Sequence, residues 1–215
     1  MILSPGRGYI FVHIPKTGGT ALSLALERRA MPDDILIGDT PKARQRRGRL
    51  RGATTRGRLW KHATLADVEG LVPDAVLDGL FAFTLVRNPW DRTVSYYHWL
   101  RDQRFAHPAV ALAQRLEFRD FVRHPQTRAS LTAHPVSAYM RRSNGRAQCA
   151  AAIRIEHLDE DAKPLWRHLG FTLDVPHVNA SNRNSDHRPY YDDATAEAVA
   201  QACAEDIARF GYRFG

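Results

Sequence analysis

Residues 9–20 read YIFVHIPKTGGT, and this stretch decides the fold. Its first six residues are mostly β-branched or aromatic, which predicts a buried strand over residues 9–14 that ends at Pro15. A turn, PKTGGT, comes next, and residues 21–30 (ALSLALERRA) follow with Leu22 and Leu26 on one helical face. The stretch therefore predicts a strand, a glycine loop and a helix in immediate succession.

The loop has the composition of an anion cradle. Two consecutive glycines let the backbone approach a ligand, and the helix N-terminus adds a positive dipole end. Lys16 adds a full charge, and Thr17 and Thr20 add hydroxyl groups. A plain strand-to-helix turn is the alternative, but it would not require a lysine with two threonines. A kinase-type P-loop places its lysine after the glycines, whereas here the lysine precedes them and no GK[ST] occurs.

A second candidate anion site follows the apolar run FAFTLV, residues 81–86, which predicts another buried strand. It runs into Arg87, Asn88 and Pro89, where Asn88 can cap a helix and Pro89 can take its first position. Arg87 then ends a strand, and Ser95 lies about two turns into the next helix. An arginine fork and a hydroxyl group are suited to a phosphate. Arg92 can contribute or can be an ordinary surface residue.

The rest of the chain predicts an α/β fold with a parallel central sheet and helices on both faces. Residues 151–155 (AAIRI) form the third expected strand. Strands that alternate with helices favour a parallel sheet, which binds ligands at the carboxyl ends of its strands. We expect helices at residues 64–71, 90–103, 117–124, 135–142, 159–170 and 195–212, and irregular structure over 31–59.

The charge of the chain is concentrated in one segment. The formal charge is +8, and residues 42–61 hold nine lysines and arginines with no acidic residue. Such a run is usually a solvated, mobile loop, but it can also contact an acidic substrate or nucleic acid. At 215 residues we expect one domain, residues 1–215, with a basic irregular insertion at about 40–60.

Composition excludes several other classes of protein. Apolar residues make up 44% of the chain, and no stretch approaches the roughly 18 apolar residues of a membrane span. The first residues do not resemble a secretory signal, so a cytoplasmic location is expected. Cys149 and Cys203 are too few for a disulfide framework, and no metal-binding pattern is present, so no metal is implied.

The two loops, PKTGGT and RNPWDRTVSYYHWLR, resemble those of the PAPS-dependent sulfotransferases, where PAPS is 3′-phosphoadenosine 5′-phosphosulfate. The likeness is closest to the branch that contains the glycan 2-O-sulfotransferases and bacterial relatives. It implies a P-loop-like sulfotransferase fold, with Arg87 and Ser95 on the 3′-phosphate of the cofactor. It implies that the 5′-phosphosulfate is held by Lys16, Thr17, Gly18, Gly19, Thr20 and Ala21.

The resemblance extends to the C-terminal part of the chain. IRIEHLDEDAKPLWRHLG, HVNASNR and DIARFGYRF are similar to later stretches of the family, so only the basic insertion and the middle region lie outside it. The loop HVNASNR, which closes near the cofactor in the family, contains Asn179, Ser181 and Arg183. We include Arg183 among the expected cofactor-binding residues.

Sulfuryl transfer needs a base for the acceptor hydroxyl, and histidine suits neutral pH. WKHATLADV resembles the family segment that contains this histidine, so the resemblance implies His62 as the base. Lys16 is expected to be catalytic as well, by neutralising the charge that develops on the bridging oxygen as the phosphosulfate bond breaks. The alternatives are a surface or capping role for His62, or His13, His98 or His177 as the base. The family places a strand before this histidine, whereas the corresponding stretch here is rich in arginine.

The sequence therefore predicts a PAPS-dependent sulfotransferase with a hydroxyl acceptor. The basic run and the likeness to glycan enzymes favour an acidic or polar carbohydrate as that acceptor. A lipid-linked sugar, a small metabolite or a tyrosine side chain is also compatible. A nucleotide-dependent kinase and a non-catalytic nucleic-acid-binding protein are the two other functions considered. The kinase lacks GK[ST], and nucleic-acid binding leaves both anion loops unexplained. Nothing in the sequence indicates the oligomeric state.

Overall fold

A computed structural model of the chain describes residues 1–175 and 184–215. The chain divides into two compact units, each with its own core. Of the described residues, the first unit contains 1–86 and 136–175, and the second contains 87–135 and 184–215. No helix in the described ranges is long and apolar enough to span a bilayer.

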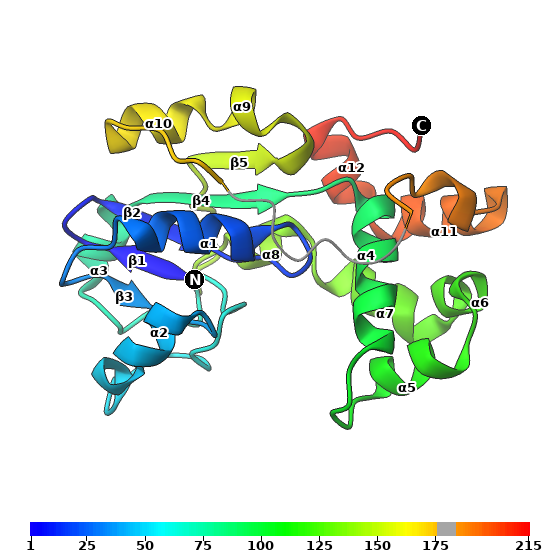
Figure 1. The fold of residues 1–215 in the computed structure, drawn as a ribbon, viewed down its shortest axis with the longest axis horizontal. Coiled ribbons are helices and arrows are strands. Elements are labelled where there is room, and N and C mark those ends of the chain that lie inside the picture. Colours follow the sequence, from blue (N-terminus) through cyan, green and yellow to red (C-terminus); the bar gives the residue numbers. More distant parts are fainter. Residues whose placement is uncertain (176–183) are drawn as a thin grey trace. The chain divides into compact units, whose positions relative to one another are not determined.

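The first unit is built on a five-stranded sheet with the order β3-β1-β2-β4-β5 (Figure 1). The strands are β1 (Ile2–Ser4), β2 (Tyr9–Val12), β3 (Ile35–Leu36), β4 (Phe81–Val86) and β5 (Ala151–Arg154). β2, β4 and β5 are parallel, with Tyr9 opposite Phe81 and Phe83 opposite Ala151. β1 is antiparallel to both β2 and β3. The α/β fold is confirmed, but the sheet is only partly parallel.

Helices cover this sheet through its alternating apolar residues. One core cluster joins Phe11, Phe83 and Ile153 of the parallel strands to Leu22 of the first helix and Leu165 of a later one. The intervening strand residues, such as Ile10, Val12 and Ala82, are buried as well, so both faces are covered. The helices of this unit are α1 (Gly19–Arg28), α2 (Pro41–Arg46), α3 (Asp74–Gly79), α8 (Val136–Tyr139), α9 (Leu158–Asp161) and α10 (Lys163–Leu169), with 3₁₀ turns η1 (Arg47–Leu50) and η2 (Ile155–His157).

The second unit is helical and has an aromatic core. Tyr97 is buried at its centre, where its ring contacts those of Phe118 and Phe121. The hydroxyl group of Tyr97 donates to the carbonyl oxygen of Leu116, which satisfies the buried polar atom. The elements are α4 (Pro89–Arg101), α5 (Pro108–Arg115), α6 (Phe118–Arg123), α7 (Pro125–Ala133), η3 (Arg188–Tyr190), α11 (Asp193–Ala202) and α12 (Ala204–Phe210).

Several expected elements differ in the structure. Residues 31–59, expected to be irregular, contain β3, α2 and η1. Residues 64–71 form turns rather than a helix: the Thr64–Asp67 capping bonds are present, but Gly70 has φ 91° and Pro73 follows shortly after. The helix expected at 159–170 is interrupted before Pro164, which lacks an N–H donor. The helix expected at 195–212 breaks at Cys203, and nothing in the structure explains that break.

A buried arginine ties the middle region to the segment before β4. Arg142 is only 6% exposed, and its guanidinium binds the carboxylates of Glu69, Asp74 and Asp78. Burial alone would raise the pKa of Glu69, but hydrogen bonds from Ser143 and Arg142 lower it to about 2. Glu69 lies in the turns before α3, and Asp74 and Asp78 lie in α3, so this single side chain joins both parts of the segment to the middle region.

Candidate functional site

The first candidate site is the loop between β2 and α1. His13 and Ile14 continue the buried run after β2, and the chain then turns sharply. Lys16 has φ 65°, a left-handed conformation that costs a non-glycine residue about 1–2 kcal/mol. Gly18 has φ 84°, which glycine adopts without that cost. The Thr17 hydroxyl donates to the carbonyl oxygen of Ile14 at 2.9 Å, so it closes the turn from within.

Both glycines are required because the loop lies close to its neighbours. A Cβ atom at Gly19 would lie 2.2 Å from Cδ2 of His13, and one at Gly18 would lie 2.3 Å from Cδ1 of Ile155. These contacts are too short for any side chain. The start of α1 therefore packs directly on the ring of His13 and on the segment that follows β5.

The start of α1 is suited to an anion. Its N-cap residue, Gly18, has no side chain to cap the helix, and no acidic residue lies in its first turn. The Ala21 N–H donates to the carbonyl oxygen of Gly18 at 3.1 Å, and Thr20 is half-buried beside it. A helix N-terminus without a capping side chain offers backbone N–H groups and a positive dipole end. Lys16 adds the charge that makes this loop a candidate phosphate or phosphosulfate cradle.

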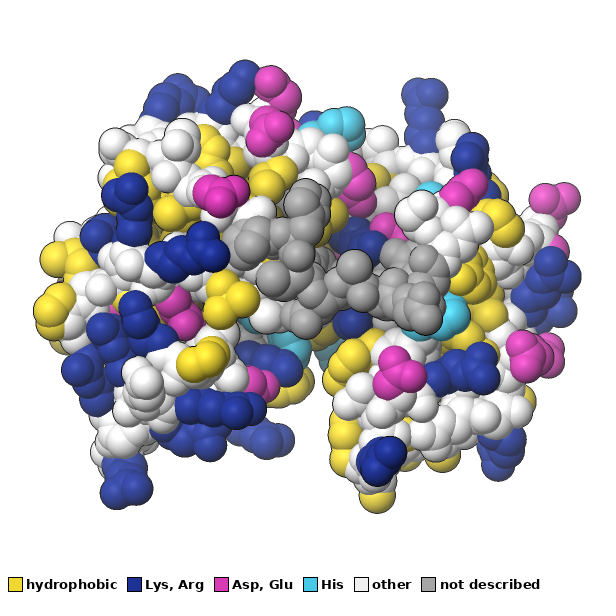
Figure 2. Space-filling view, in the orientation of Figure 1, with side chains coloured by type: hydrophobic (Ala, Val, Ile, Leu, Met, Phe, Trp, Pro, Cys, Tyr) yellow, Lys and Arg dark blue, Asp and Glu magenta, His cyan; other side chains and the backbone are white. Residues whose placement is uncertain are grey.

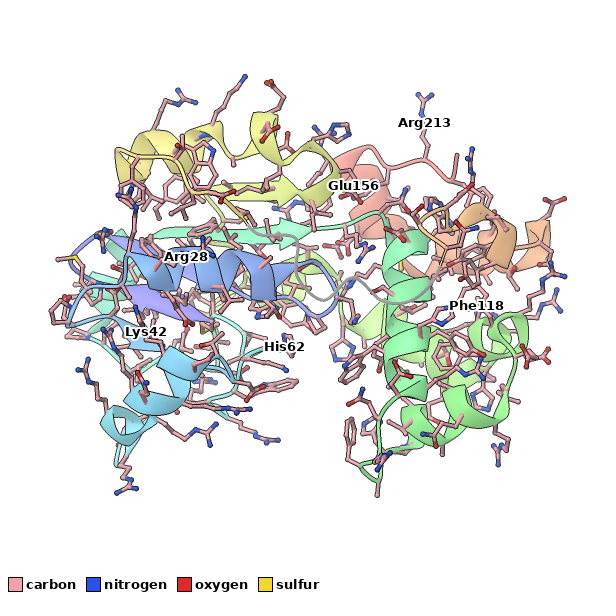
Figure 3. The ribbon with its side chains drawn as sticks, in the orientation of Figure 1. Arg28, Lys42, His62, Phe118, Glu156 and Arg213 are labelled. Carbon is pink, nitrogen blue, oxygen red and sulfur yellow. The ribbon has the colours of Figure 1, made fainter. Side chains whose placement is uncertain are left out.

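His62 lies beside the end of β2, on the segment that follows the basic run (Figure 3). Its Nδ1 atom lies 2.7 Å from the carbonyl oxygen of His13. A carbonyl oxygen can only accept a hydrogen bond, so Nδ1 of a neutral His62 ring must bear the hydrogen. Its Nε2 atom then has the free lone pair. This is the tautomer that a general base requires.

The surroundings of His62 keep its ring neutral. Burial lowers the pKa of His62 to about 4, although the hydrogen bond to His13 acts in the opposite direction. The ring meets that of His13 edge-on at 4.7 Å between centroids and that of Trp60 at 5.1 Å. Burial also holds the pKa of His13 well below its usual value. Both imidazoles are therefore uncharged near neutral pH, and only His62 has its Nδ1 hydrogen fixed by a described contact to a carbonyl.

The second candidate site belongs to the helical unit. Arg87 directly follows β4, and its Nε and Nη2 atoms each lie 2.7 Å from Oδ2 of Asp91. This pair fixes the plane of the guanidinium group. The Asn88 side chain accepts from the N–H groups of Trp90 and Asp91, as expected for a cap. Ser95 lies on α4 and is buried.

The other expected site residues have different positions. His13 lies against Gly19 and His62 as described, whereas His98 is on α4 with its ring against Tyr97 and Tyr190. In the first unit, Gly19 of the Lys16–Ala21 loop and His62 both lie against His13. Arg87 and Ser95 belong to the second unit. The expectations for His177, Asn179, Ser181 and Arg183 lie outside the described residues.

Two adjoining cavities beside the loop were not expected from the sequence. The first, of about 430 Å³, is lined by polar residues of α1, namely Thr20, Ser23 and Glu27, together with His13 and Lys61. The second, of about 590 Å³, shares Ile37, Gly38, Asp39 and Lys61 with the first. The spacing of Thr20, Ser23 and Glu27 at i, i+3 and i+7 is the signal that could have revealed the first cavity, because it marks a polar face on an otherwise apolar helix.

The model of the sulfotransferase family matches residues 1–213. No curated protein matches significantly. Among solved structures, the crystal structure of mouse sulfotransferase SULT7A1 complexed with PAP is similar, with 15% sequence identity and a TM-score of 0.46. That match covers 95% of this chain and 86% of the mouse chain.

Proposed function

Because the chain belongs to the sulfotransferase family, we propose that it transfers a sulfuryl group from PAPS to a hydroxyl group of a carbohydrate acceptor. The family match confirms the resemblance carried by the two loops. It also spans both compact units, which supports treating residues 1–215 as one sulfotransferase domain. We further propose a cytoplasmic location, since a chain with two cysteines and no disulfide framework suits a reducing compartment.

The loop after β2 fits the 5′ end of the cofactor. Lys16, Thr20 and the N–H groups at the start of α1 would hold it. Gly18 and Gly19 allow the loop to pack closely on its neighbours. Ala21 and the Thr17 hydroxyl group maintain the shape of the loop. Arg87 and Ser95 would hold the 3′-phosphate, with Asp91 orienting the guanidinium. Arg183 stays part of this proposal on the resemblance alone. When bound, PAPS supplies the activated sulfuryl group.

His62 would remove the proton from the acceptor hydroxyl. The hydrogen bond from its Nδ1 to the His13 carbonyl leaves Nε2 as the acceptor of that proton. One observation carries this assignment most strongly: His13 contacts both the base and the cofactor loop, because its carbonyl oxygen accepts from His62 while its ring covers Gly19. The same residue would thus position both the proposed base and the proposed cofactor loop.

Lys16 would stabilise negative charge at the 5′ end as the sulfuryl group leaves. A lysine ammonium beside a helix N-terminus offers a fixed positive field, which is most effective where charge develops. Lys16 has a left-handed backbone conformation two residues before Gly18, the N-cap of α1. The polar cavity lined by Thr20 and Ser23 supports a carbohydrate acceptor, since hydroxyl groups recognise other hydroxyl groups by hydrogen bonds.

The cofactor assignment is tested by calorimetric titration with 3′-phosphoadenosine 5′-phosphate (PAP), the cofactor product. ADP and ATP with magnesium serve as controls. We expect PAP to bind at least tenfold more tightly than ADP, because a charged hydrogen-bonded phosphate contact contributes about 1.5–3 kcal/mol. Equal affinities for PAP and ADP would rule out the proposed 3′-phosphate site. Tighter binding of ATP with magnesium would favour a kinase instead.

A further inference from the structure

The residues after α12 contact the start of α4. Gly211 has φ 67° and ends α12, and the N–H group of Tyr212 donates to the carbonyl oxygen of Ile207 at 3.2 Å. Glycine adopts this left-handed conformation readily, so the chain can leave the helix here and turn. Residues 212–215, which we call the tail segment, then reach the first turn of α4 and the residue that caps it.

The Phe214 side chain lies among three aromatic rings of the helical unit. Its ring centroid is 5.6 Å from that of Trp90, 5.4 Å from that of Tyr191 and 5.6 Å from that of His187, each pair meeting edge to face. Edge-to-face pairs place positive ring edges against negative ring faces, which favours one orientation of the ring. The backbone carbonyl oxygen of Phe214 also accepts from Nε2 of His187 at 2.9 Å. Phe214 is therefore held by both its side chain and its backbone.

A hydrogen bond connects the tail segment to the cap of α4. The Asn88 side chain donates from Nδ2 to the carbonyl oxygen of Arg213 at 3.0 Å. Its Oδ1 atom accepts from the N–H groups of Trp90 and Asp91, at 3.0 and 3.4 Å. An amide has separate donor and acceptor atoms, so Asn88 caps the helix and binds the tail segment at the same time.

The same turn holds the arginine of the proposed 3′-phosphate site. Asp91, whose N–H group donates to Asn88, accepts from Nε and Nη2 of Arg87 with its Oδ2 atom, both at 2.7 Å. Trp90 is only 4% exposed, and the hydroxyl group of Tyr191 donates to its carbonyl oxygen at 2.8 Å. A displacement of this turn would therefore change the direction of the Arg87 guanidinium group.

We infer that the tail segment is a positioning element for the 3′-phosphate of the cofactor. Phe214 and the carbonyl oxygen of Arg213 hold the first turn of α4, and that turn orients Arg87 through the carboxylate of Asp91. The inference rests on the proposed function, because the contact between Arg87 and the 3′-phosphate is part of that proposal. Phe214 acts through other residues and needs no contact with the cofactor. The family match ends at residue 213, so it does not include Phe214.

The side chain of Arg213 provides a matched control on the same segment. It is exposed and extends away from its helical unit in Figure 3. Figure 2 shows a Lys or Arg side chain projecting from the surface over the end of the chain, at the upper right. Substitution of Arg213 removes a positive charge and leaves the carbonyl oxygen that binds Asn88. It therefore distinguishes positioning by packing from attraction of the phosphate by charge.

The test measures the affinities of the full chain and its variants for PAP and ADP by calorimetry. Phe214→Ala should lower the ratio of PAP to ADP affinity by about 2- to 12-fold, since this is the affinity lost when one long side chain must be ordered on binding. The affinity for ADP should stay nearly constant, because ADP has no 3′-phosphate. Phe214→Leu, which keeps an apolar side chain among the three rings, should restore most of the ratio.

Variants of Asn88 and Arg213 test the connection itself. Asn88→Ser keeps an oxygen atom for the helix cap but has no second polar atom for the Arg213 carbonyl, so it should lower the same ratio. The effects of Asn88→Ser and Phe214→Ala should not add in the double variant, because both changes release the same turn. Arg213→Ala should leave the ratio unchanged. Urea denaturation of each variant measures its stability separately.

Two results would overturn the inference. If Phe214→Ala and Asn88→Ser lower stability but keep the PAP-to-ADP ratio of the unmodified chain, the tail segment only completes the aromatic core. If Arg213→Ala lowers the ratio as much as Phe214→Ala, the segment acts through its charge and not through its packing. Equal affinities of the unmodified chain for PAP and ADP would instead reject the proposed 3′-phosphate site, so the two failures are distinguishable.

Discussion

His62 donates from Nδ1 to the carbonyl oxygen of His13 at 2.7 Å, and this hydrogen bond leaves the other ring nitrogen unprotonated. We predict that His62→Asn lowers kcat by about 10²- to 10⁴-fold, because an amide cannot accept the hydroxyl proton. The asparagine can still donate to the same carbonyl, so PAP affinity should change less than twofold. Turnover and PAP calorimetry are measured on the same preparation. Near-normal turnover of the variant would exclude His62 as the base.

The pH dependence of turnover follows from the same histidine. Burial lowers the pKa of His62 from 6.5 to about 4, so the base stays unprotonated as pH falls from 8 to 5. We therefore expect kcat to be nearly constant over that range and to decline only as pH approaches 4. The profile is recorded after confirming by circular dichroism that the protein is folded at each pH. An acidic limb centred near 6.5 would contradict the buried environment of His62.

The contact between Gly19 and His13 predicts an unusual sensitivity to one methyl group. Gly19→Ala would place Cβ 2.2 Å from Cδ2 of His13, so we expect a loss of about 1–3 kcal/mol in the free energy of unfolding and a lower kcat. His13→Ala in the same chain should remove the clash, giving a favourable coupling of about 0.5–3 kcal/mol in a double-mutant cycle. Gly79→Ala is the control, since its Cβ would have no neighbour within 4 Å. Additive effects of Gly19→Ala and His13→Ala would argue against the contact.

Arg87 and Ser95 should determine the preference for a 3′-phosphate. Arg87→Ala is expected to reduce the ratio of PAP to ADP affinity by about 10- to 150-fold, as loss of a charged hydrogen-bonded contact implies. Ser95→Ala should have a smaller effect, about 2- to 12-fold, because a neutral hydroxyl contributes about 0.5–1.5 kcal/mol. Arg104→Gln, an exposed position of the same unit, serves as the control. If the Arg87 and Ser95 variants lose as much affinity for ADP as for PAP, these two residues do not recognise the 3′-phosphate.

The carboxylate cluster around Arg142 predicts that Arg142 contributes much more to the free energy of unfolding than the nearby Arg146. Arg142→Ala should lower the free energy of unfolding by about 3–5 kcal/mol, because it leaves Glu69 partly buried without its main partner. Arg146 also binds Asp78 but is half exposed, so Arg146→Ala should cost less than about 1 kcal/mol. Urea denaturation at pH 7 measures both. If the two variants lost similar amounts of unfolding free energy, the burial of Arg142 would not account for its contribution to stability.

The three parallel strands, two of which precede the candidate loops, could be predicted because each lies in a continuous apolar stretch of sequence. Residues 9–14, 81–86 and 151–155 are nearly uninterrupted apolar runs, and the structure contains β2, β4 and β5 there. β1 and β3 have three and two residues, too few to show any periodicity. β1 pairs with the edge of β2, and β3 pairs in turn with β1, so both strands depend on the assembled sheet.

The candidate site shows the same division between local and distant contacts. The loop from Lys16 to Thr20 can be recognised from adjacent residues, but the hydrogen bond between His62 and His13 joins positions 49 residues apart. The basic run is a similar case. The composition of the run is compatible with a mobile loop and with a binding surface. The structure shows that Lys42 and Arg46 donate hydrogen bonds to backbone carbonyl oxygens, which the sequence could not indicate.

Lys16 occupies a backbone conformation that glycine would adopt more easily. A glycine at this position should therefore stabilise the fold, by up to about 1 kcal/mol, while it removes the charge proposed to assist the reaction. A laboratory selection for heat resistance alone would therefore favour the Lys16→Gly substitution. Efforts to raise the heat resistance of this protein for use as a biocatalyst would thus need turnover as a second criterion, since the stabilising glycine would remove the charge proposed for catalysis.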